Sequence, residues 1–399
     1  MISNLPQIGI LLFIASLVAI LTRRLRLPYT VGLVLAGFGL YFLPIQVPLH
    51  LTKDLIFLVF LPPLIFEAAL CLRWPDLKRN LPVVGLLATL GVLVAAGVTA
   101  IGMHYLFDWP WHSALLFGVL IAATDPVSVI ATFKEAGLNG RLRLLIEAES
   151  LLNDGTAAVA FVAVLGIIAG EQQTAASLFG SLFLTISGGI VIGIAIGYGF
   201  MILAGRTNDP LVELTLSTLT AYGSFFVAER YGLSGVLAAL SAGLVVGNSR
   251  SQWSSDGGRR ALLAFWEFVA FIANSLIFIL IGLQEAQQHF RGLGIPVCIA
   301  IALVTFSRAI TIYPLCALFA RTRWRVEVSH QHGLFWGGLR GALALALALA
   351  LPADLEQRDT IVVLTFAVVA FSVFVQGLTI APLLRKLGQL MPERTGGWS

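Results

Sequence analysis

The sequence predicts an all-α membrane protein that crosses the bilayer thirteen times, and three observations lead to this fold class. Of the 399 residues, 58% are hydrophobic and only 12% are charged, whereas a soluble protein carries about 25% charged residues. Apolar runs long enough to cross the hydrocarbon recur along the whole chain. The basic residues fall into alternate loops between these runs. These features exclude a soluble globular protein, and the net charge of +4 reflects topology rather than a nucleic-acid-binding surface.

The predicted spans follow from the length of the apolar runs, since a transmembrane helix needs about 20 apolar residues. Thirteen runs meet this criterion; they lie near residues 6–22, 29–44, 55–72, 82–106, 112–132, 144–169, 175–204, 210–228, 233–248, 262–284, 295–319, 331–351 and 360–384. The second and the ninth are short and rich in glycine. Because every loop between them is short, we expect a single membrane domain with no soluble domain inserted.

The orientation follows from the positive charges. With the N-terminus outside, nineteen of the 25 Lys and Arg residues fall on the cytoplasmic side and four fall outside. The remaining two, Arg308 and Arg340, lie inside spans. Cytoplasmic loops carry an excess of basic residues, so the sequence predicts a multi-pass protein of the cell membrane with its N-terminus outside and its C-terminus in the cytoplasm.

An internal repeat is indicated by two stretches that resemble two others about 205–212 positions later. Residues 27–37 resemble residues 232–243, and the Leu-Ile-Phe at 64–66 recurs at 276–278. The partners are seven spans apart, so corresponding helices run in opposite directions. This predicts inverted-topology repeats with a site near the membrane midplane. Chance similarity between apolar segments is the alternative.

The repeat pairs the fifth span with the twelfth, and both contain helix-breaking residues. The fifth holds Asp125 followed by Pro126, which removes a backbone donor and disfavours helix at the preceding residue. The twelfth holds Gly-Gly-Leu-Arg-Gly at 337–341, where glycine weakens the helix. Two interrupted helices would expose carbonyl and N–H groups to a shared cavity that can bind a cation or an acid. A simple proline kink with glycine packing is the alternative.

Acidic residues in the sixth span indicate an ion or proton pathway. With a rise of 1.5 Å per residue, Asp154 lies roughly 15 Å from the cytoplasmic end, near the midplane. Glu147, Ser150 and Asp154 follow i, i+3, i+7 and share one stripe, which would line a cytoplasmic path to the centre. Asp125 falls at a similar depth. A buried polar network that only specifies packing is the alternative.

The chemistry of these side chains suits a hard monovalent cation, which prefers oxygen ligands. The oxygen donors that the sequence offers are Asp154, Asp125, Thr124, Ser150 and a further candidate, Glu67. Because no histidine lies in mid-span and no Cys or His spacing suggests a metal site, we expect no transition metal and no cofactor. The same oxygens serve Na⁺, Li⁺ and K⁺, so the choice among these ions stays open.

Other ionisable residues have predicted structural roles. Arg308 and Arg340 cannot deprotonate, so each needs an anionic or carbonyl partner. Glu149, one position off the acidic stripe, is the candidate partner. His330 and His332, at the inner end of the twelfth span, either contribute to a pH response or are ordinary interfacial residues.

At these residues the chain resembles the cation:proton antiporter-1 family, the sodium/proton antiporters related to sodium–hydrogen exchangers. The matching motifs occupy residues 61–67, 123–127, 149–154, 306–308 and 337–342. The resemblance implies a homodimer whose dimerisation part comprises about residues 6–72 and 175–284. It implies a transport part of about residues 82–170 and 295–384, in which the unwound fifth and twelfth helices cross.

The resemblance also implies roles for individual residues. The implied ion ligands are Asp154, Asp125, Thr124, Ser150 and Glu67. Asn153 would stabilise the site, Glu149 would form an ion pair with Arg308, and Arg340 would steady the broken helix. Electrogenic relatives carry Asp-Asp where this chain has Asn-Asp at 153–154, so the resemblance implies electroneutral exchange.

The sequence therefore predicts a secondary transporter, and not an enzyme, that exchanges Na⁺ or Li⁺ for H⁺. Cation and proton would compete for Asp154 and Asp125, and the expected partners are the lipid bilayer, monovalent cations and a second copy of the chain, with no nucleic acid. An intramembrane aspartyl protease is the rival from the enzyme class, but its Gly-x-Gly-Asp element is missing from the sequence. A channel or receptor is the other rival, which saturable, pH-dependent counterflow would separate from an exchanger.

Overall fold

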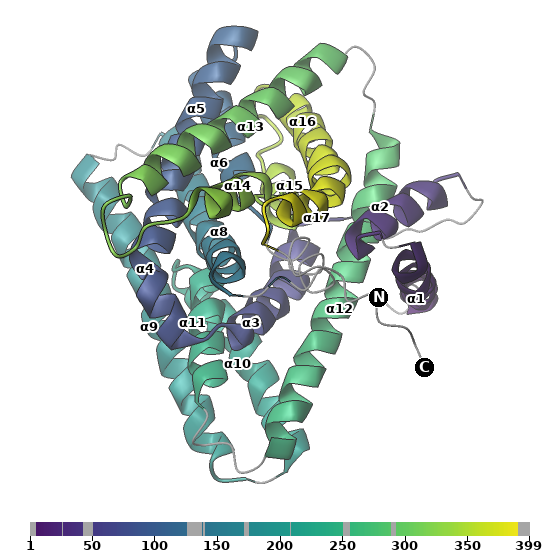
Figure 1. Cartoon of the computed structure of the whole chain (residues 1–399), viewed down its shortest axis with the longest axis vertical. Helices are drawn as coiled ribbons and strands as arrows, with labels where there is room; N and C mark the ends of the chain where they lie inside the picture. Colours follow the sequence, from purple (N-terminus) through teal and green to yellow (C-terminus); the bar gives the residue numbers. More distant parts are fainter. Residues whose placement is uncertain are drawn as a thin grey trace.

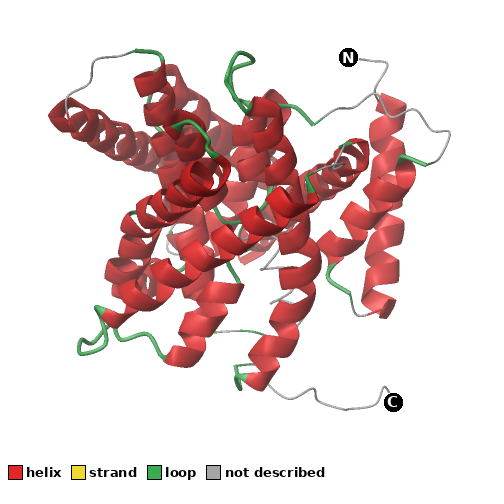
Figure 2. Ribbon diagram, turned by 90° about the horizontal axis from the view of Figure 1, so that it is seen from above, coloured by secondary structure: helices red, strands yellow, loops and turns green. Residues whose placement is uncertain are grey.

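The computed structural model describes residues 5–25, 27–42, 51–125, 138, 140–170, 175–207, 209–249, 256–288 and 293–389. These residues form helices joined by turns and contain no strand (Figures 1 and 2). Among them, eight segments are long and apolar enough to cross a membrane: Gln7–Leu25, Trp74–Phe107, Arg141–Ile168, Gly180–Ala204, Pro210–Arg230, Gly258–Gln287, Gly294–Ala317 and Arg358–Lys386. Shorter apolar helices lie between them. The predicted all-α polytopic class is confirmed, while the count of thirteen spans stays a prediction.

The helices are named here in chain order. They are α1 (Leu5–Leu25), α2 (Tyr29–Leu40), the π-helical η2 (Leu55–Phe60), α3 (Leu61–Cys71), α4 (Trp74–Ala88), α5 (Leu90–Phe107), α6 (Trp111–Ala122), α8 (Arg141–Ile168), α9 (Ala175–Ala204), α10 (Pro210–Arg230), α11 (Gly235–Asn248), α12 (Asp256–Gln287), α13 (Gly294–Ala317), α14 (Val328–Trp336), α15 (Ala342–Leu349), α16 (Arg358–Phe371), the π-helical η3 (Ser372–Gln376) and α17 (Gly377–Lys386).

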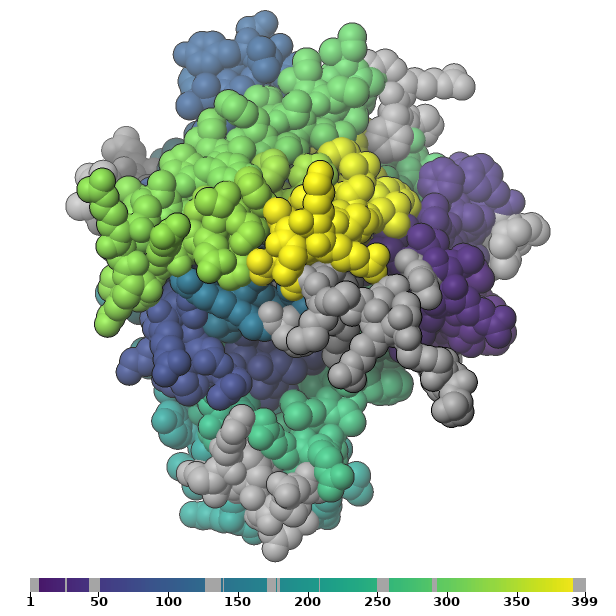
Figure 3. Space-filling view, viewed as in Figure 1, coloured from purple at the N-terminus to yellow at the C-terminus, as the bar shows by residue number. Residues whose placement is uncertain are grey.

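The helices gather in two groups. Helices α5, α13 and α16 lie toward one end of the molecule, and α9, α10 and part of α12 lie toward the other (Figure 1). The C-terminal helices cover much of one face, with α1 and α2 at its side (Figure 3). Helix α3 packs against α11 and α12 and also contacts α8, which brings it beside the helix that carries Asp154.

The fourth predicted span begins earlier than the sequence pattern indicated. Helix α4 starts at Trp74 rather than near residue 82, because the chain leaves an extended Arg73 and continues with Trp-Pro in the first turn, where proline's missing N–H and fixed φ favour helix initiation. Lys78 and Arg79, assigned to a loop from their charge, lie exposed on this first part of α4, while Leu77 is buried. The boundary shifted because the beginning of the helix is amphipathic rather than uniformly apolar.

The predicted interruption of the twelfth span is confirmed, since residues 337–341 are not helical and separate α14 from α15. In the fifth span α6 ends at Ala122, and the chain leaves the helix at an extended Ala123. Pro126 and the rest of that predicted span lie outside the described residues. The two irregular segments contact each other: the Asp125 N–H donates to the Leu339 carbonyl at 2.7 Å. The crossing of complete fifth and twelfth helices stays a prediction.

The packing of the glycine-rich helices follows the predicted repeat. Helix α2 packs closely on α12 through Gly37 and Gly282, and α11 packs closely on α3 through Gly243 and Gly247. A Cβ at any of these positions would collide with backbone of the facing helix. In the predicted repeat the second span (α2) corresponds to the ninth (α11), and the third (α3) corresponds to the tenth (α12). The contact between α2 and α12 therefore corresponds to the contact between α11 and α3. The same small-residue seam, typical of close membrane helix packing, therefore occurs twice.

We predict that Gly37→Leu destabilises the protein and that Gly39→Leu does not. A side chain at Gly37 would collide with the α12 backbone, whereas Gly39, two residues along the same helix, has open space around it. Overpacking of this kind costs about 1–3 kcal/mol. Thermal unfolding of the detergent-purified variants measures the difference, and equal unfolding temperatures for the two variants would contradict the packing seam.

Candidate functional site

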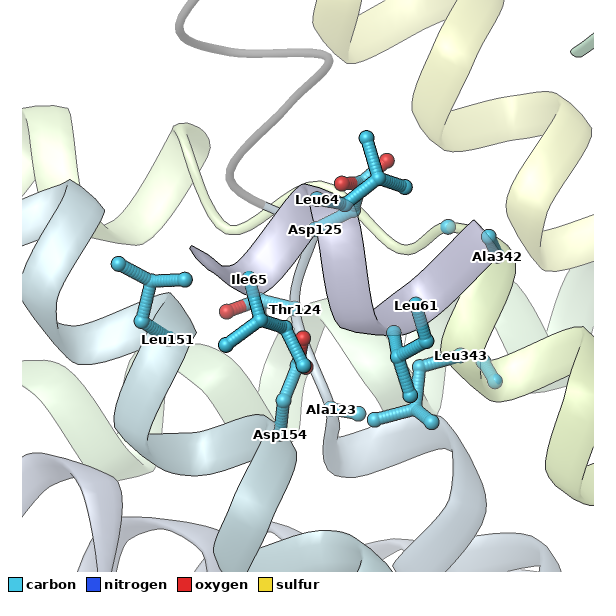
Figure 4. A pocket seen from close by; sticks show the side chains of 12 residues that line it. Leu61, Leu64, Ile65, Ala123, Thr124, Asp125, Leu151, Asp154, Ala342 and Leu343 are labelled. Carbon is cyan, nitrogen blue, oxygen red and sulfur yellow. The ribbon is translucent and has the colours of Figure 1, made fainter. Parts of the chain in front are cut away.

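A small buried pocket lies where α3, α8, the end of α6 and the start of α15 meet (Figure 4). The cavity volume is about 30 Å³, and one water molecule needs roughly 10–15 Å³. The lining residues are Leu61, Leu64, Ile65, Ala123, Thr124, Asp125, Leu151, Asp154, Gly341, Ala342, Leu343 and Ala344. Two of them are acidic and none is basic, so the pocket suits a bare cation or a proton.

Asp154 is the central polar group of the pocket. It lies in the middle of α8, is only 6% exposed, and has an Oδ1 atom that finds no hydrogen-bond partner among the described residues. Figure 4 shows its side chain pointing toward the extended segment that carries Thr124 and Asp125. A buried carboxylate oxygen without a hydrogen-bond partner is costly, so the surroundings of Oδ1 favour a positively charged species beside it.

The segment around Thr124 is tied to α8 by reciprocal hydrogen bonds. The Thr124 N–H donates to Asn153 Oδ1 at 3.2 Å, and Asn153 Nδ2 donates to Thr124 Oγ1 at 2.6 Å. Ser150 Oγ donates to the Thr124 carbonyl at 3.1 Å and lies 2.6 Å from Thr124 Oγ1. These bonds satisfy backbone groups that the end of α6 leaves unpaired, and they hold the two hydroxyl oxygens beside the pocket.

Glu149 faces away from the pocket and binds Arg308 of α13. Arg308 Nη1 and Nη2 each donate to one Glu149 oxygen at 2.8 Å, and Nη2 also donates to the Leu334 carbonyl at 3.1 Å. Asn153 Nδ2 donates to Glu149 at 3.1 Å. A continuous set of hydrogen bonds thus runs from α13 through Glu149 and Asn153 to the segment that lines the pocket.

Arg340 joins the two irregular segments. It lies within the interruption between α14 and α15, is buried, and donates from Nη1 to the Ala123 carbonyl at 3.1 Å. Together with the backbone bond from Asp125 to Leu339, this contact fixes the end of α6 against the broken helix.

The structure leaves two predicted acids outside the pocket lining. Glu147, in the cytoplasmic half of α8, is buried and accepts a hydrogen bond from Arg143 Nε at 2.5 Å. Glu67 is half-buried on α3 and accepts a weak bond from Cys71 Sγ at 3.9 Å. The residues that the structure does bring together are Asp154, Asp125 and Thr124, with Ser150 bonded to Thr124. Ion binding by any of these residues stays a prediction.

Sequence reasoning missed the part that Gly341 plays. A Cβ at this position would collide with the Asp125 carboxyl group, so glycine is required for the acid to lie against the start of α15. The sequence offered only a run of helix-breaking glycines, and nothing in that run separates the one that faces an acid from the others.

The fold and the site define a class of protein: a multi-pass membrane protein whose interrupted helices meet at a buried acidic pocket, as in secondary transporters. A family model described as "Sodium/hydrogen exchanger, transmembrane" matches residues 10–386. The chain therefore belongs to the sodium/hydrogen exchanger family.

Similar proteins support this membership. The chain is 41% identical over 395 residues to the Na⁺/H⁺ antiporter ApNhaP of Aphanothece halophytica, a match that covers 96% of this chain and 75% of the relative. It is 38% identical over 404 residues to the low-affinity Na⁺/H⁺ antiporter NhaS1 of Synechocystis, covering 98% of this chain and 76% of the relative. The solved structure of the sodium proton antiporter MjNhaP1 from Methanocaldococcus jannaschii at pH 8 superposes with a TM-score of 0.77 over 97% of this chain and 99% of that chain, at 21% identity, and so shares its fold.

We predict that Glu149→Gln strongly destabilises the protein, because it removes the charge that compensates a buried guanidinium. Breaking a buried ion pair in this way costs about 3–5 kcal/mol. The control is Asp359→Asn, whose side chain is 95% exposed and pairs with Arg358 at 3.2 Å; exposed pairs contribute about 0–1 kcal/mol. Thermal unfolding should show a large drop for the first variant alone, and equal small drops would contradict a structural role for the pair.

Proposed function

We propose that this protein is a secondary active transporter that exchanges Na⁺ for H⁺ across the cell membrane. The observation that carries the proposal is the buried Oδ1 of Asp154, which has no hydrogen-bond partner among the residues that the structure describes. Asp154 lines a pocket together with Asp125. The names of the relatives, which are Na⁺/H⁺ antiporters, support the choice of the two exchanged ions.

Competition for the same oxygens provides the coupling between the ions. The carboxylates of Asp154 and Asp125 share a pocket whose described lining holds no basic residue, so they repel each other when both are ionised. Either a proton on one carboxyl group or a bound cation relieves that repulsion. The pocket is therefore unfavourable when it holds neither a proton nor a cation. Because the two species bind to the same oxygens, the pocket carries one species in one direction and the other species in the return direction.

The proposed cation ligands are the carboxylates of Asp154 and Asp125 and the hydroxyls of Thr124 and Ser150. Each hydroxyl already takes part in hydrogen bonds, but an oxygen with two lone pairs can accept a further partner. Glu67 is the fifth proposed ligand, reached by a change of side-chain rotamer on α3. Glu147 would attract the cation from the cytoplasm at an earlier point on the path.

Electroneutral exchange is supported by the bonding of Asn153. Its Nδ2 donates to Thr124 and Glu149, and its Oδ1 accepts from the Thr124 backbone, so the side chain uses donors that an ionised carboxylate lacks. A neutral residue here leaves the two pocket carboxylates to exchange one proton for one cation.

Alternating access would come from movement of a transport part, about residues 82–170 and 295–384, against a dimerisation part, about residues 6–72 and 175–284. The pocket supports this division because α3 of the second part and α6, α8 and α15 of the first all contribute lining residues. Sliding at this boundary would open the pocket to one side and then to the other. The glycine seams between α2 and α12 and between α3 and α11 lie within the dimerisation part of a homodimer, and the N-terminus would face outside.

We predict that Asp154→Asn abolishes Na⁺-driven proton movement in proteoliposomes, because an amide can neither exchange a proton nor balance a cation. Asp359→Asn, the same change on an exposed side chain, should retain the activity. Acridine-orange fluorescence after a Na⁺ pulse measures the proton flux, with the orientation and quantity of protein matched. Full exchange by the Asp154→Asn variant would reject the proposed site.

We also predict that exchange does not depend on membrane potential. Transfer of one net charge per cycle would change the driving force by about 2.3 kcal/mol per 100 mV, whereas one-for-one exchange transfers none. The rate should be the same with potentials of either sign imposed by valinomycin and a K⁺ gradient. A rate that follows the potential would mean unequal stoichiometry and would contradict the role assigned to Asn153.

A further inference from the structure

A second buried cavity lies behind the ion pair, between α13, the interruption of α14–α15 and the π-helical turn η3. Its lining residues are Ile301, Val304, Thr305, Arg308, Phe335, Gly338, Arg340, Val368, Phe371, Ser372 and Gln376. None of them lines the acidic pocket. The cavity volume is about 10 Å³, room for a single small species of roughly the size of a water molecule.

Arg308 brings an unused donor to this cavity. The residue is only 6% exposed, and its Nε has no hydrogen-bond partner within the part of the chain that the structure describes. A Cβ at Gly338, another lining residue, would collide with this Nε and the adjoining guanidinium carbon. The guanidinium therefore lies flat against Gly338, with its Nε–H at the cavity wall.

Arg340 brings a second guanidinium, to which no carboxylate is hydrogen-bonded in the part of the chain that the structure describes. It is 2% exposed, and the Ala123 carbonyl is its one hydrogen-bond partner in the described ranges. Both oxygens of Glu149 are bonded to Arg308. The described lining of the cavity thus holds two guanidinium groups and no carboxylate. Buried positive charges are stabilised by an anion placed beside them, so this wall favours a negatively charged occupant.

The π-helical turn η3 adds a neutral donor. Ser372 Oγ donates to Gln376 Oε1 at 2.7 Å, and both residues are buried. With its oxygen engaged by the serine, the Gln376 amide has its N–H₂ group left to donate. Single π-helical turns in α-helices are frequent at functional sites, and this turn places serine and glutamine side by side on the cavity wall.

We propose that the cavity is a binding site for a small monovalent anion, chloride, held between Arg308 and Arg340 and bonded by Gln376. A halide accepts hydrogen bonds and donates none, which matches a wall of guanidinium and amide N–H groups, and its negative charge is favoured beside the two guanidinium groups. A single water molecule would accept the same bonds but brings no negative charge. The bound anion joins α13 and η3 to the interrupted helix, and through Arg340 it steadies the segment that carries Asp125.

The test is thermal unfolding of the purified full chain in choline chloride and in choline gluconate, at equal ionic strength and pH and without Na⁺. Chloride should raise the unfolding temperature saturably, as expected for a ligand that binds only the folded state, and bromide should do the same. The measurement needs no transport, so its outcome is independent of the exchange activity proposed above. Equal unfolding temperatures in chloride and gluconate would overturn the proposal and leave water as the occupant.

Two variants locate the effect. Gln376→Glu supplies a carboxylate in place of the anion, so the rise caused by chloride should disappear, while Gln287→Glu, the same change on an exposed residue of α12, should keep it. If Gln376→Glu does not fold, Gln376→Leu removes the amide donor and should shift the chloride response to higher concentration. An unchanged chloride response in whichever of the two variants folds would place the anion elsewhere and overturn the assignment.

Discussion

The structure depends on one constraint: irregular backbone inside a membrane must find its hydrogen-bond partners within the protein. Residues 123–125, which follow α6, and residues 337–341, which lie between α14 and α15, are irregular, so each segment has N–H and carbonyl groups that no helix satisfies. The structure resolves this by setting the interruptions against each other and against side chains of α8 and α13. The Asp125 N–H donates to the Leu339 carbonyl, Arg340 to the Ala123 carbonyl, Arg308 to the Leu334 carbonyl, and the Thr124 N–H donates to Asn153 Oδ1.

This constraint explains why charged groups are retained in the core although their burial is costly. Arg308 and Arg340 each donate to a carbonyl that an interrupted helix has exposed, which an apolar residue could not do. Their charges in turn require compensation, and Glu149 supplies part of it. The acids thereby differ in their contacts: Glu149 accepts hydrogen bonds from a guanidinium and an amide, whereas one oxygen of Asp154 has no partner among the described residues.

The sequence predicted those features that depend on local pattern. Apolar length gave the membrane class, proline and glycine gave the two interruptions, and helical spacing placed Asp154 in the middle of its span. Glu149 was identified as the candidate partner of a buried arginine because it lies one position off the acidic stripe, and its ion pair with Arg308 confirms this. These inferences succeeded because a charge or a helix breaker inside an apolar run is rare and therefore informative.

Features that depend on close approach between distant segments could not be predicted in this way. Gly338 lies against a guanidinium and Gly341 against a carboxyl group, yet in the sequence both are members of one glycine run. The residues of α3 that line the pocket are Leu61, Leu64 and Ile65 rather than Glu67. The face that a helix turns toward a pocket depends on how it packs against its neighbours, which the sequence of the helix does not give. The early start of α4 was missed for a related reason: apolar length does not detect an amphipathic first turn.

The predicted repeat places the two irregular segments at equivalent positions, and these segments carry opposite charges. The break after α6 carries an acid, Asp125, and the break between α14 and α15 carries a guanidinium, Arg340. With one of each, the arginine bonds to the backbone of the opposing break and holds it in place, while the acid faces the pocket. The two segments thus differ in their contacts: the one after α6 contributes an acid to the pocket, and the one between α14 and α15 contributes the arginine that holds it in place.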